Sequence, residues 1–182
     1  MRQLHFCGKD FILNISEEEE VAIYNVCSEA TTVLKPGHEG SAKNASMDPI
    51  GDFLATTGCD GNVHIYSLPM PGQKPELVTK KRICGKTLVE SDLVLEPAWT
   101  HNGSVLLTPG ERMIGVLTRD TWQFKHEETL THDKEISICR FATAEVLLTA
   151  GLDNKVKVWD WENKRGLYFI ETESPVLSIK YS

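Results

Sequence analysis

The chain has 182 residues, of which 41% are hydrophobic and 25% charged, an ordinary composition for a soluble globular protein. Its formal net charge of −7 argues against direct DNA binding by this chain, because nucleic-acid-binding domains usually present a basic face. The five cysteines are scattered without a Cys-x-x-Cys pair, which favours reduced thiols in the cytosol or nucleus, and no apolar run approaches the roughly 18 residues of a membrane span.

Four segments along the chain share one pattern. They end at Tyr24, Tyr66, Leu117 and Trp159, and each has an acidic residue six positions before its end. The ends are separated by 42, 51 and 42 residues. The longer middle interval predicts an insertion over residues 69–86, a stretch rich in proline, glycine and lysine.

Each segment also has the same internal order. An apolar run is followed by a β-prone run, then by a turn with Gly, Asp or Glu, and then by a run in which apolar residues alternate, as Val63 and Ile65 do. Alternation with period two is typical of a half-buried strand. A fourth, more polar strand such as residues 30–36 or 166–171 completes the unit as an outer edge. The fixed period argues against a β-sandwich, whose strands do not repeat.

Four-stranded units at this spacing resemble WD repeats, which build β-propellers. The predicted fold is therefore all-β, with four blades over residues 1–36, 37–85, 86–131 and 132–173 and the first strand of a fifth over residues 174–182. Propellers usually close at about 4–8 blades. We therefore expect a partial propeller that belongs to a longer one.

The resemblance to WD repeats implies a hydrogen-bonded tetrad inside a blade. Two sets of residues fit it: His132, Thr149, Asp153 and Trp159, and His38, Thr56, Asp60 and Tyr66. Buried polar groups persist when each has a partner. A His, Asp and hydroxyl set also resembles a hydrolase site, but its recurrence indicates architecture, and no catalytic residue is predicted.

The sequence shows neither the ligand spacing of a zinc site nor a complete phosphate-binding loop, so no metal or cofactor is predicted. Two charged segments are candidate contacts for a protein partner of opposite charge. One is the acidic turn of Glu17, Glu18, Glu19 and Glu20. The other is the basic cluster of Lys80, Lys81 and Arg82, placed in a loop between blades.

The third unit carries a more specific resemblance. In residues 95–123 the two repeat positions that usually hold Asp and Trp are occupied by Glu111 and Leu117, and Pro109 stands where a glycine is expected. The segment ends in an Arg-x-x-Trp element at Arg119 and Trp122. They resemble a blade from the N-terminal propeller of a replisome adaptor family. That family includes the WD repeat and HMG-box DNA-binding proteins and the fungal chromosome transmission fidelity factor.

Several positions depart from that family. Asn44 and Ser46 stand where a first strand is expected to be apolar, and Tyr66 replaces the usual Trp. The family's second propeller, through which it forms a trimer, and its basic HMG box have no counterpart in these residues. Trimerisation and HMG-type DNA binding are therefore not expected of this chain.

The resemblance implies a non-enzymatic nuclear adaptor that binds replisome proteins and links the replicative helicase to DNA polymerase α. Two other hypotheses stay open. One is a WD-repeat scaffold of another pathway, such as a substrate receptor of a ubiquitin ligase. The other is an enzyme with an active site in the central channel, for which the sequence offers no recognisable nucleophile–base or carboxylate pair.

Overall fold

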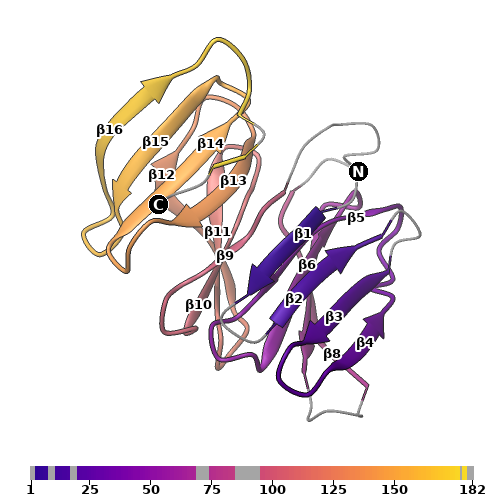
Figure 1. Cartoon of the computed structure of the whole chain (residues 1–182). Helices are drawn as coiled ribbons and strands as arrows, with labels where there is room; N and C mark the ends of the chain where they lie inside the picture. Colours follow the sequence, from indigo (N-terminus) through magenta and orange to yellow (C-terminus); the bar gives the residue numbers. More distant parts are fainter. Residues whose placement is uncertain are drawn as a thin grey trace.

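The computed structural model describes residues 3–7, 11–16, 20–68, 74–84, 95–176 and 178–179. Within these ranges the chain forms sixteen β-strands, and no helix there is long and apolar enough to cross a membrane. The prediction of an all-β propeller architecture is confirmed: the strands form four antiparallel sheets of four strands each (Figure 1).

Each sheet takes four strands that follow one another in the sequence, so every connection is a simple turn between neighbours. The first blade contains β1 (Gln3–Cys7), β2 (Phe11–Ile15), β3 (Val21–Asn25) and β4 (Ala30–Leu34). The second contains β5 (Ala42–Met47), β6 (Phe53–Gly58), β7 (Asn62–Ser67) and β8 (Glu76–Arg82). The third contains β9 (Ala98–Trp99), β10 (Val105–Thr108), β11 (Met113–Thr118) and β12 (Phe124–Thr131). The fourth contains β13 (Ile136–Phe141), β14 (Val146–Gly151), β15 (Lys155–Asp160) and β16 (Arg165–Glu171).

The turn between the second and third strands of a blade follows from local chemistry. In the second blade it contains Asp60 and Gly61, and in the fourth it contains Asp153 and Asn154. Gly61 has φ 69° and Asn154 has φ 59°, in the left-handed region that glycine and asparagine tolerate best. The aspartate before each of them caps the turn by accepting the backbone N–H two residues on.

The blades stand side by side around a common axis, with the first and fourth at opposite ends of the row (Figure 1). The innermost strands β5, β9 and β13 contact one another in that order. A parallel bridge between Glu96 and Ile138 joins the third and fourth blades near the axis. Where a fifth blade is expected to begin, residues 174–176 and 178–179 lie in no strand, and the other residues after 173 lie outside the described part.

The hydrophobic core lies between the blades rather than inside any one of them. One cluster joins Leu13, Val21 and their neighbours in the first blade to Leu54 and Tyr66 in the second. Two further clusters fill the space between the second and third blades and between the third and fourth. Each blade therefore covers the apolar face of the next, as expected of a repeat architecture.

The Arg-x-x-Trp element of the third blade ties that blade to the second. Arg119 Nη1 donates to Asp48 Oδ2 at 3.0 Å, and Asp48 is buried. The guanidinium also lies 4.7 Å from the centre of the Phe53 ring, and Trp122 meets the same ring edge-on at 5.0 Å. Arg119 Nη2 also donates to Asp52 Oδ2 at 2.5 Å, so the element is an interblade contact made of two charge pairs, a cation–π contact and an edge-on aromatic pair.

Candidate functional site

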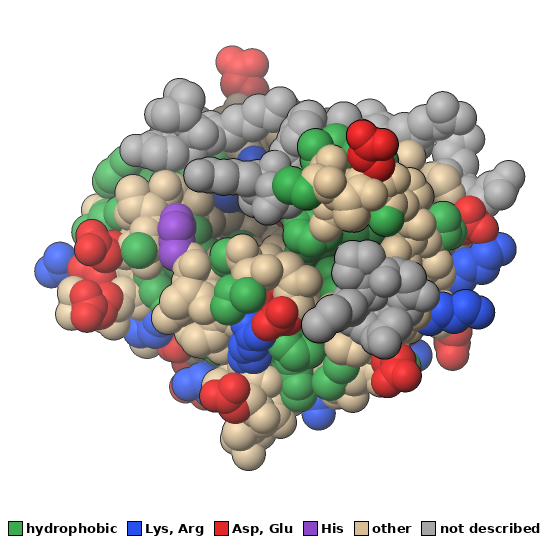
Figure 2. All heavy atoms as spheres, turned by 60° about the horizontal axis from the view of Figure 1, so that its bottom comes forward, with side chains coloured by type: hydrophobic (Ala, Val, Ile, Leu, Met, Phe, Trp, Pro, Cys, Tyr) green, Lys and Arg blue, Asp and Glu red, His purple; other side chains and the backbone are tan. Residues whose placement is uncertain are grey.

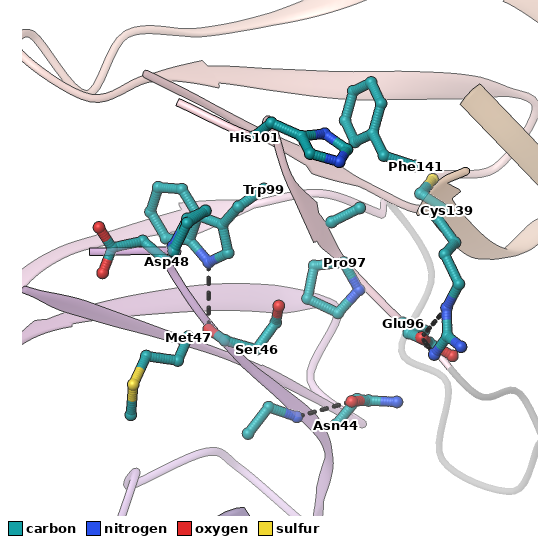
Figure 3. Close-up of a pocket in the computed structure, with 14 residues that line it drawn as sticks. Asn44, Ser46, Met47, Asp48, Glu96, Pro97, Trp99, His101, Cys139 and Phe141 are labelled. Atoms are coloured by element: carbon teal, nitrogen blue, oxygen red, sulfur yellow. Dashed lines mark hydrogen bonds and ion pairs between the residues drawn. The ribbon is translucent and has the colours of Figure 1, made fainter. Parts of the chain in front are cut away.

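A cavity of about 500 Å³ opens at the axis, where the inner strands of three blades converge. Its wall combines apolar side chains of Met47, Pro97, Trp99 and Phe141 with the polar side chain of Asn44 (Figure 3). The volume lies in the range of cavities that hold small ligands or side chains of a partner. The site depends on three strands that lie far apart in the sequence.

Asn44 supplies an unpaired donor at this cavity. Its Oδ1 accepts the backbone N–H of Ala45 at 2.8 Å, which fixes the orientation of the amide. Asn44 is only 1% exposed, and its Nδ2 makes no hydrogen bond within the described residues. Figure 3 shows this nitrogen on the side of the amide away from Ala45. A buried donor without a partner costs about 1–3 kcal/mol. Because this nitrogen has almost no accessible surface, a ligand carbonyl in the cavity reaches it only if the surrounding side chains shift.

An ion pair also lines the cavity. Arg140 Nε donates to Glu96 Oε1 at 3.0 Å, its Nη2 contacts the same oxygen, and its Nη1 donates to the carbonyl of Ile179. Glu96 is buried, whereas the Arg140 side chain is 30% exposed, so the pair is partly shielded from water. A shielded pair of this kind positions a polar group of a ligand more strongly than an exposed pair would.

The chemistry of the cavity is that of binding. Burial raises the pKa of the Cys139 thiol, so that side chain stays protonated and is a poor nucleophile. His101 packs edge-on against Phe141 at 6.1 Å. The described residues at the axis therefore offer an aromatic wall, one amide donor and an ion pair.

In the fourth blade the residues expected to form a tetrad are linked by hydrogen bonds. His132 Nδ1 lies 2.9 Å from Asp153 Oδ1, and His132 Nε2 lies 2.7 Å from Thr149 Oγ1. Trp159 Nε1 donates to the same hydroxyl at 2.8 Å. Burial lowers the pKa of His132 despite the nearby carboxylate, which favours the neutral ring that a hydrogen-bond relay requires.

In the second blade the aromatic residue makes a different hydrogen bond from the one that Trp159 makes. His38 bonds Asp60 at 3.0 Å and Thr56 at 2.9 Å, as His132 does with its own partners. Tyr66, however, donates its hydroxyl to the carbonyl of Pro36 instead of to Thr56. A phenol carries its O–H at the tip of the ring, whereas an indole carries its N–H on the side. Tyrosine therefore reaches past the threonine, and the expectation that Tyr66 completes this tetrad needs that correction.

His38, Asp60 and His64 are the group of buried side chains in the described residues close enough to hold a metal ion, with ligand atoms within 4.8 Å of one another. The two imidazoles stack, with ring centres 3.9 Å apart and an angle of 18° between planes. A metal binds in the plane of each ring at about 2.1 Å from nitrogen. Two nearly parallel planes do not meet at that distance, so the donor set does not converge on one ion.

The segments proposed as partner contacts have different positions in the structure. Glu17, Glu18 and Glu19 lie outside the described residues, while Glu20 pairs with Lys35 at 2.9 Å. Lys80, Lys81 and Arg82 belong to strand β8, and their assignment to a loop is wrong. A strand forms there because these residues pair in register with Asn62, Val63 and His64 of β7. The face drawn in Figure 2 shows basic and acidic side chains interspersed.

The axial cavity was not predicted from the sequence. The sequence feature from which it could have been predicted is the presence of Asn44 and Ser46 in a first strand expected to be apolar. Ser46 lines the cavity together with Asn44, and its carbonyl accepts a hydrogen bond from Trp99 Nε1 at 3.1 Å. Polar residues in a first strand that is expected to be apolar are thus the sequence feature found at the site.

Comparison with known proteins supports the repeat assignment. Residues 29–67 and 124–160 match the family model described as WD domain, G-beta repeat. The chain is 24% identical over 140 residues to WD repeat and HMG-box DNA-binding protein 1 of Mus musculus. The aligned region covers 70% of this chain and 12% of the mouse protein.

Two further relatives have other names. WD repeat-containing protein 1-A of Xenopus laevis is 30% identical over 108 residues, covering 58% of this chain and 16% of the relative. The p21-activated protein kinase-interacting protein 1-like protein of Gallus gallus is 23% identical over 164 residues, covering 90% of this chain and 41% of the relative. The chain thus spans less than half the length of each of these proteins.

Proposed function

We propose that this chain, a WD-repeat protein, is a non-enzymatic interaction scaffold that holds a segment of a partner protein in the axial cavity. The observation that carries the proposal is the Asn44 amide nitrogen, buried without a partner at the edge of an aromatic cavity. An extended peptide offers an apolar side chain to Trp99 and Phe141, and a backbone carbonyl to the Asn44 nitrogen once the side chains that cover this nitrogen shift. The Glu96–Arg140 pair then selects the polar group beside it.

We further propose that the scaffold serves as a nuclear replisome adaptor that links the replicative helicase to DNA polymerase α. Support comes from the Arg-x-x-Trp blade and from the similarity to WD repeat and HMG-box DNA-binding protein 1 over 140 residues. A scaffold of another pathway is the second candidate, because a protein named for its interaction with p21-activated kinase matches 90% of the chain at 23% identity.

Proximity labelling in dividing cells tests the proposal, with the protein carrying either Asn44→Leu or the matched control Asn163→Leu. Asn163 is exposed and lies in a turn of the fourth blade. Leucine at residue 44 removes the unsatisfied nitrogen but also the acceptor for the Ala45 N–H, so urea denaturation must first show that the variant is folded. We expect replisome proteins among the labelled neighbours of the parent and control, and their loss in Asn44→Leu.

Two outcomes would contradict the proposal. Equal labelling by Asn44→Leu and the parent would show that the cavity does not hold the partner. Neighbours confined to ubiquitin-ligase or kinase pathways would reject the replisome role and favour the second candidate. A titration with duplex DNA adds an independent check: the net charge of −7 predicts weak binding, and tight binding at physiological salt would overturn the assignment to a protein partner.

A further inference from the structure

Strand β16 is an outer edge strand, but its central side chains are apolar, and the expectation of a more polar strand at residues 166–171 is wrong. Among the strands whose burial is described, β2 to β16, it is the one in which every residue is exposed. Its four central side chains, Leu167, Tyr168, Phe169 and Ile170, are 45%, 62%, 56% and 53% exposed. The strand also ends its sheet, so one row of its backbone N–H and C=O groups has no neighbouring strand.

The outer strands of the other blades are built differently at matching positions. Tyr168 lies opposite Val158 of β15, and the corresponding neighbours in the second and third blades are Thr79 opposite Ile65 and Lys125 opposite Val116. Ile170 likewise matches Lys81 and Glu127. Packing between blades therefore does not require apolar residues at these positions.

Charges on an edge strand normally prevent it from pairing with another chain. Strand β8 carries Lys80, Lys81 and Arg82, and β12 carries Lys125, Glu127 and Glu128. Strand β4 has five residues, two of them threonines, and is shorter than β16. Strand β16 has charges only at its ends, Arg165 and Glu171, and these have opposite signs.

We propose that β16 pairs antiparallel with β16 of a second copy of the chain, so that two four-stranded sheets become one sheet of eight strands. The sequence complements itself about Tyr168. When Tyr168 lies opposite Tyr168 of the second copy, Arg165 falls opposite Glu171 in both halves of the interface, and Leu167 falls opposite Phe169. Opposite charges and aromatic–aliphatic pairs that face each other across strands stabilise an antiparallel pair.

This pairing has the symmetry of a closed dimer. The same surface is used on both copies, which satisfies the free edge of each and leaves no further edge of β16 to extend the assembly. The axial cavity lies at the inner strands, on the opposite side of the blade from β16. Self-association is therefore independent of partner binding in that cavity.

Sedimentation equilibrium of the 182-residue chain across a wide range of concentration tests the proposal. We expect a monomer–dimer equilibrium in the parent, and a monomer in Tyr168→Lys, which introduces the kind of charge that β8 carries. The control is Val33→Lys on β4, a residue 55% exposed on another outer strand, which should leave the equilibrium unchanged. A parent that stays monomeric, or a dimer that Tyr168→Lys leaves intact, would overturn the proposal.

The charge register gives a sharper test. Arg165→Glu or Glu171→Arg alone should weaken the dimer by about tenfold, because two cross-strand pairs at roughly 0.2–1 kcal/mol each change from attraction to repulsion. The double variant Arg165→Glu/Glu171→Arg restores opposite charges and should recover the parental constant. Failure to recover would reject this register.

Cross-linking keeps the proposal testable if the chain also associates through other surfaces. A Tyr168→Cys variant places two thiols opposite each other across the two-fold axis and should form a disulfide-linked dimer on mild oxidation. Val33→Cys controls for random collisions and for the native thiols. Equal cross-linking of the two variants would contradict the pairing of β16 with its copy.

Discussion

Three threonines occupy the same position in the second, third and fourth blades, and their hydroxyl groups have different numbers of hydrogen-bond partners within the described residues: two, one and none. Thr149, Thr56 and Thr108 lie on the second strands of their blades, opposite Lys157, His64 and Gly115. All three are fully buried. Substitution by valine removes the hydroxyl and keeps nearly the same shape, so the change in stability reports the hydrogen bonds.

The structure sets the order of the effects. The Thr149 hydroxyl serves His132 and Trp159, so Thr149→Val leaves two buried groups unpaired and should cost about 2–6 kcal/mol at about 1–3 for each. Thr56→Val leaves only the His38 ring nitrogen unpaired and should cost about 1–3 kcal/mol. The Thr108 hydroxyl has no partner in the described residues, so Thr108→Val should be neutral or stabilising.

Urea denaturation of the parent and the three variants measures these differences, with the slope of the transition as a check that the unfolded surface has not changed. Because the substitution is the same in each case, differences in unfolded-state behaviour largely cancel. Equal midpoint shifts for Thr149→Val and Thr108→Val would refute the idea that the relay stabilises the fourth blade. So would a large loss of stability in Thr108→Val.

Two more predictions concern charge. Arg119→Met should cost about 1–3 kcal/mol in urea denaturation, because it leaves the buried carboxylate of Asp48 without its cation; an unchanged midpoint would show that the contact between blades contributes nothing. Stability should also fall as the pH drops below about 6.5. Burial lowers the pKa of His38, His64 and His132, so the unfolded chain takes up protons first, at a cost of up to about 1.4 kcal/mol per pH unit for each ring. Midpoints measured at several pH values check this, and midpoints that do not change below pH 6.5 would contradict it.

The strand architecture could be predicted because its determinants are local. Alternation such as Val63 and Ile65 directs side chains to one face, and Asp60 with Gly61 specifies the turn that precedes it. These features recur from blade to blade, so each copy supports the others. The outcome is a set of four meanders in which every strand pairs with its neighbour in the sequence.

Other features depend on geometry that a repeat pattern does not contain. The cluster at Lys80 was expected in a loop, because its composition suits one, but pairing with β7 makes it a strand. The Tyr66 hydroxyl reaches Pro36 because of the length of a phenol, which an alignment of aromatic positions does not express. The axial cavity combines Asn44, Trp99 and Arg140 from three blades, so its shape depends on how the blades are arranged around the axis.

Asn44 and Thr108 both carry buried polar atoms without partners, yet they differ in what lies beside them. Thr108 belongs to the degenerate blade, where Leu117 stands in place of the aromatic residue that would complete a relay, and its neighbours are closely packed. Its buried hydroxyl therefore costs stability, and the packed surroundings leave no room for a ligand that would bind it. Asn44 lines a cavity with room for a ligand, and its amide is oriented by Ala45, although its nitrogen must be uncovered before a ligand can bind it. An orphaned group at such a place is stabilised only when a partner binds. The unpaired donor at the axis is therefore the stronger indication of function.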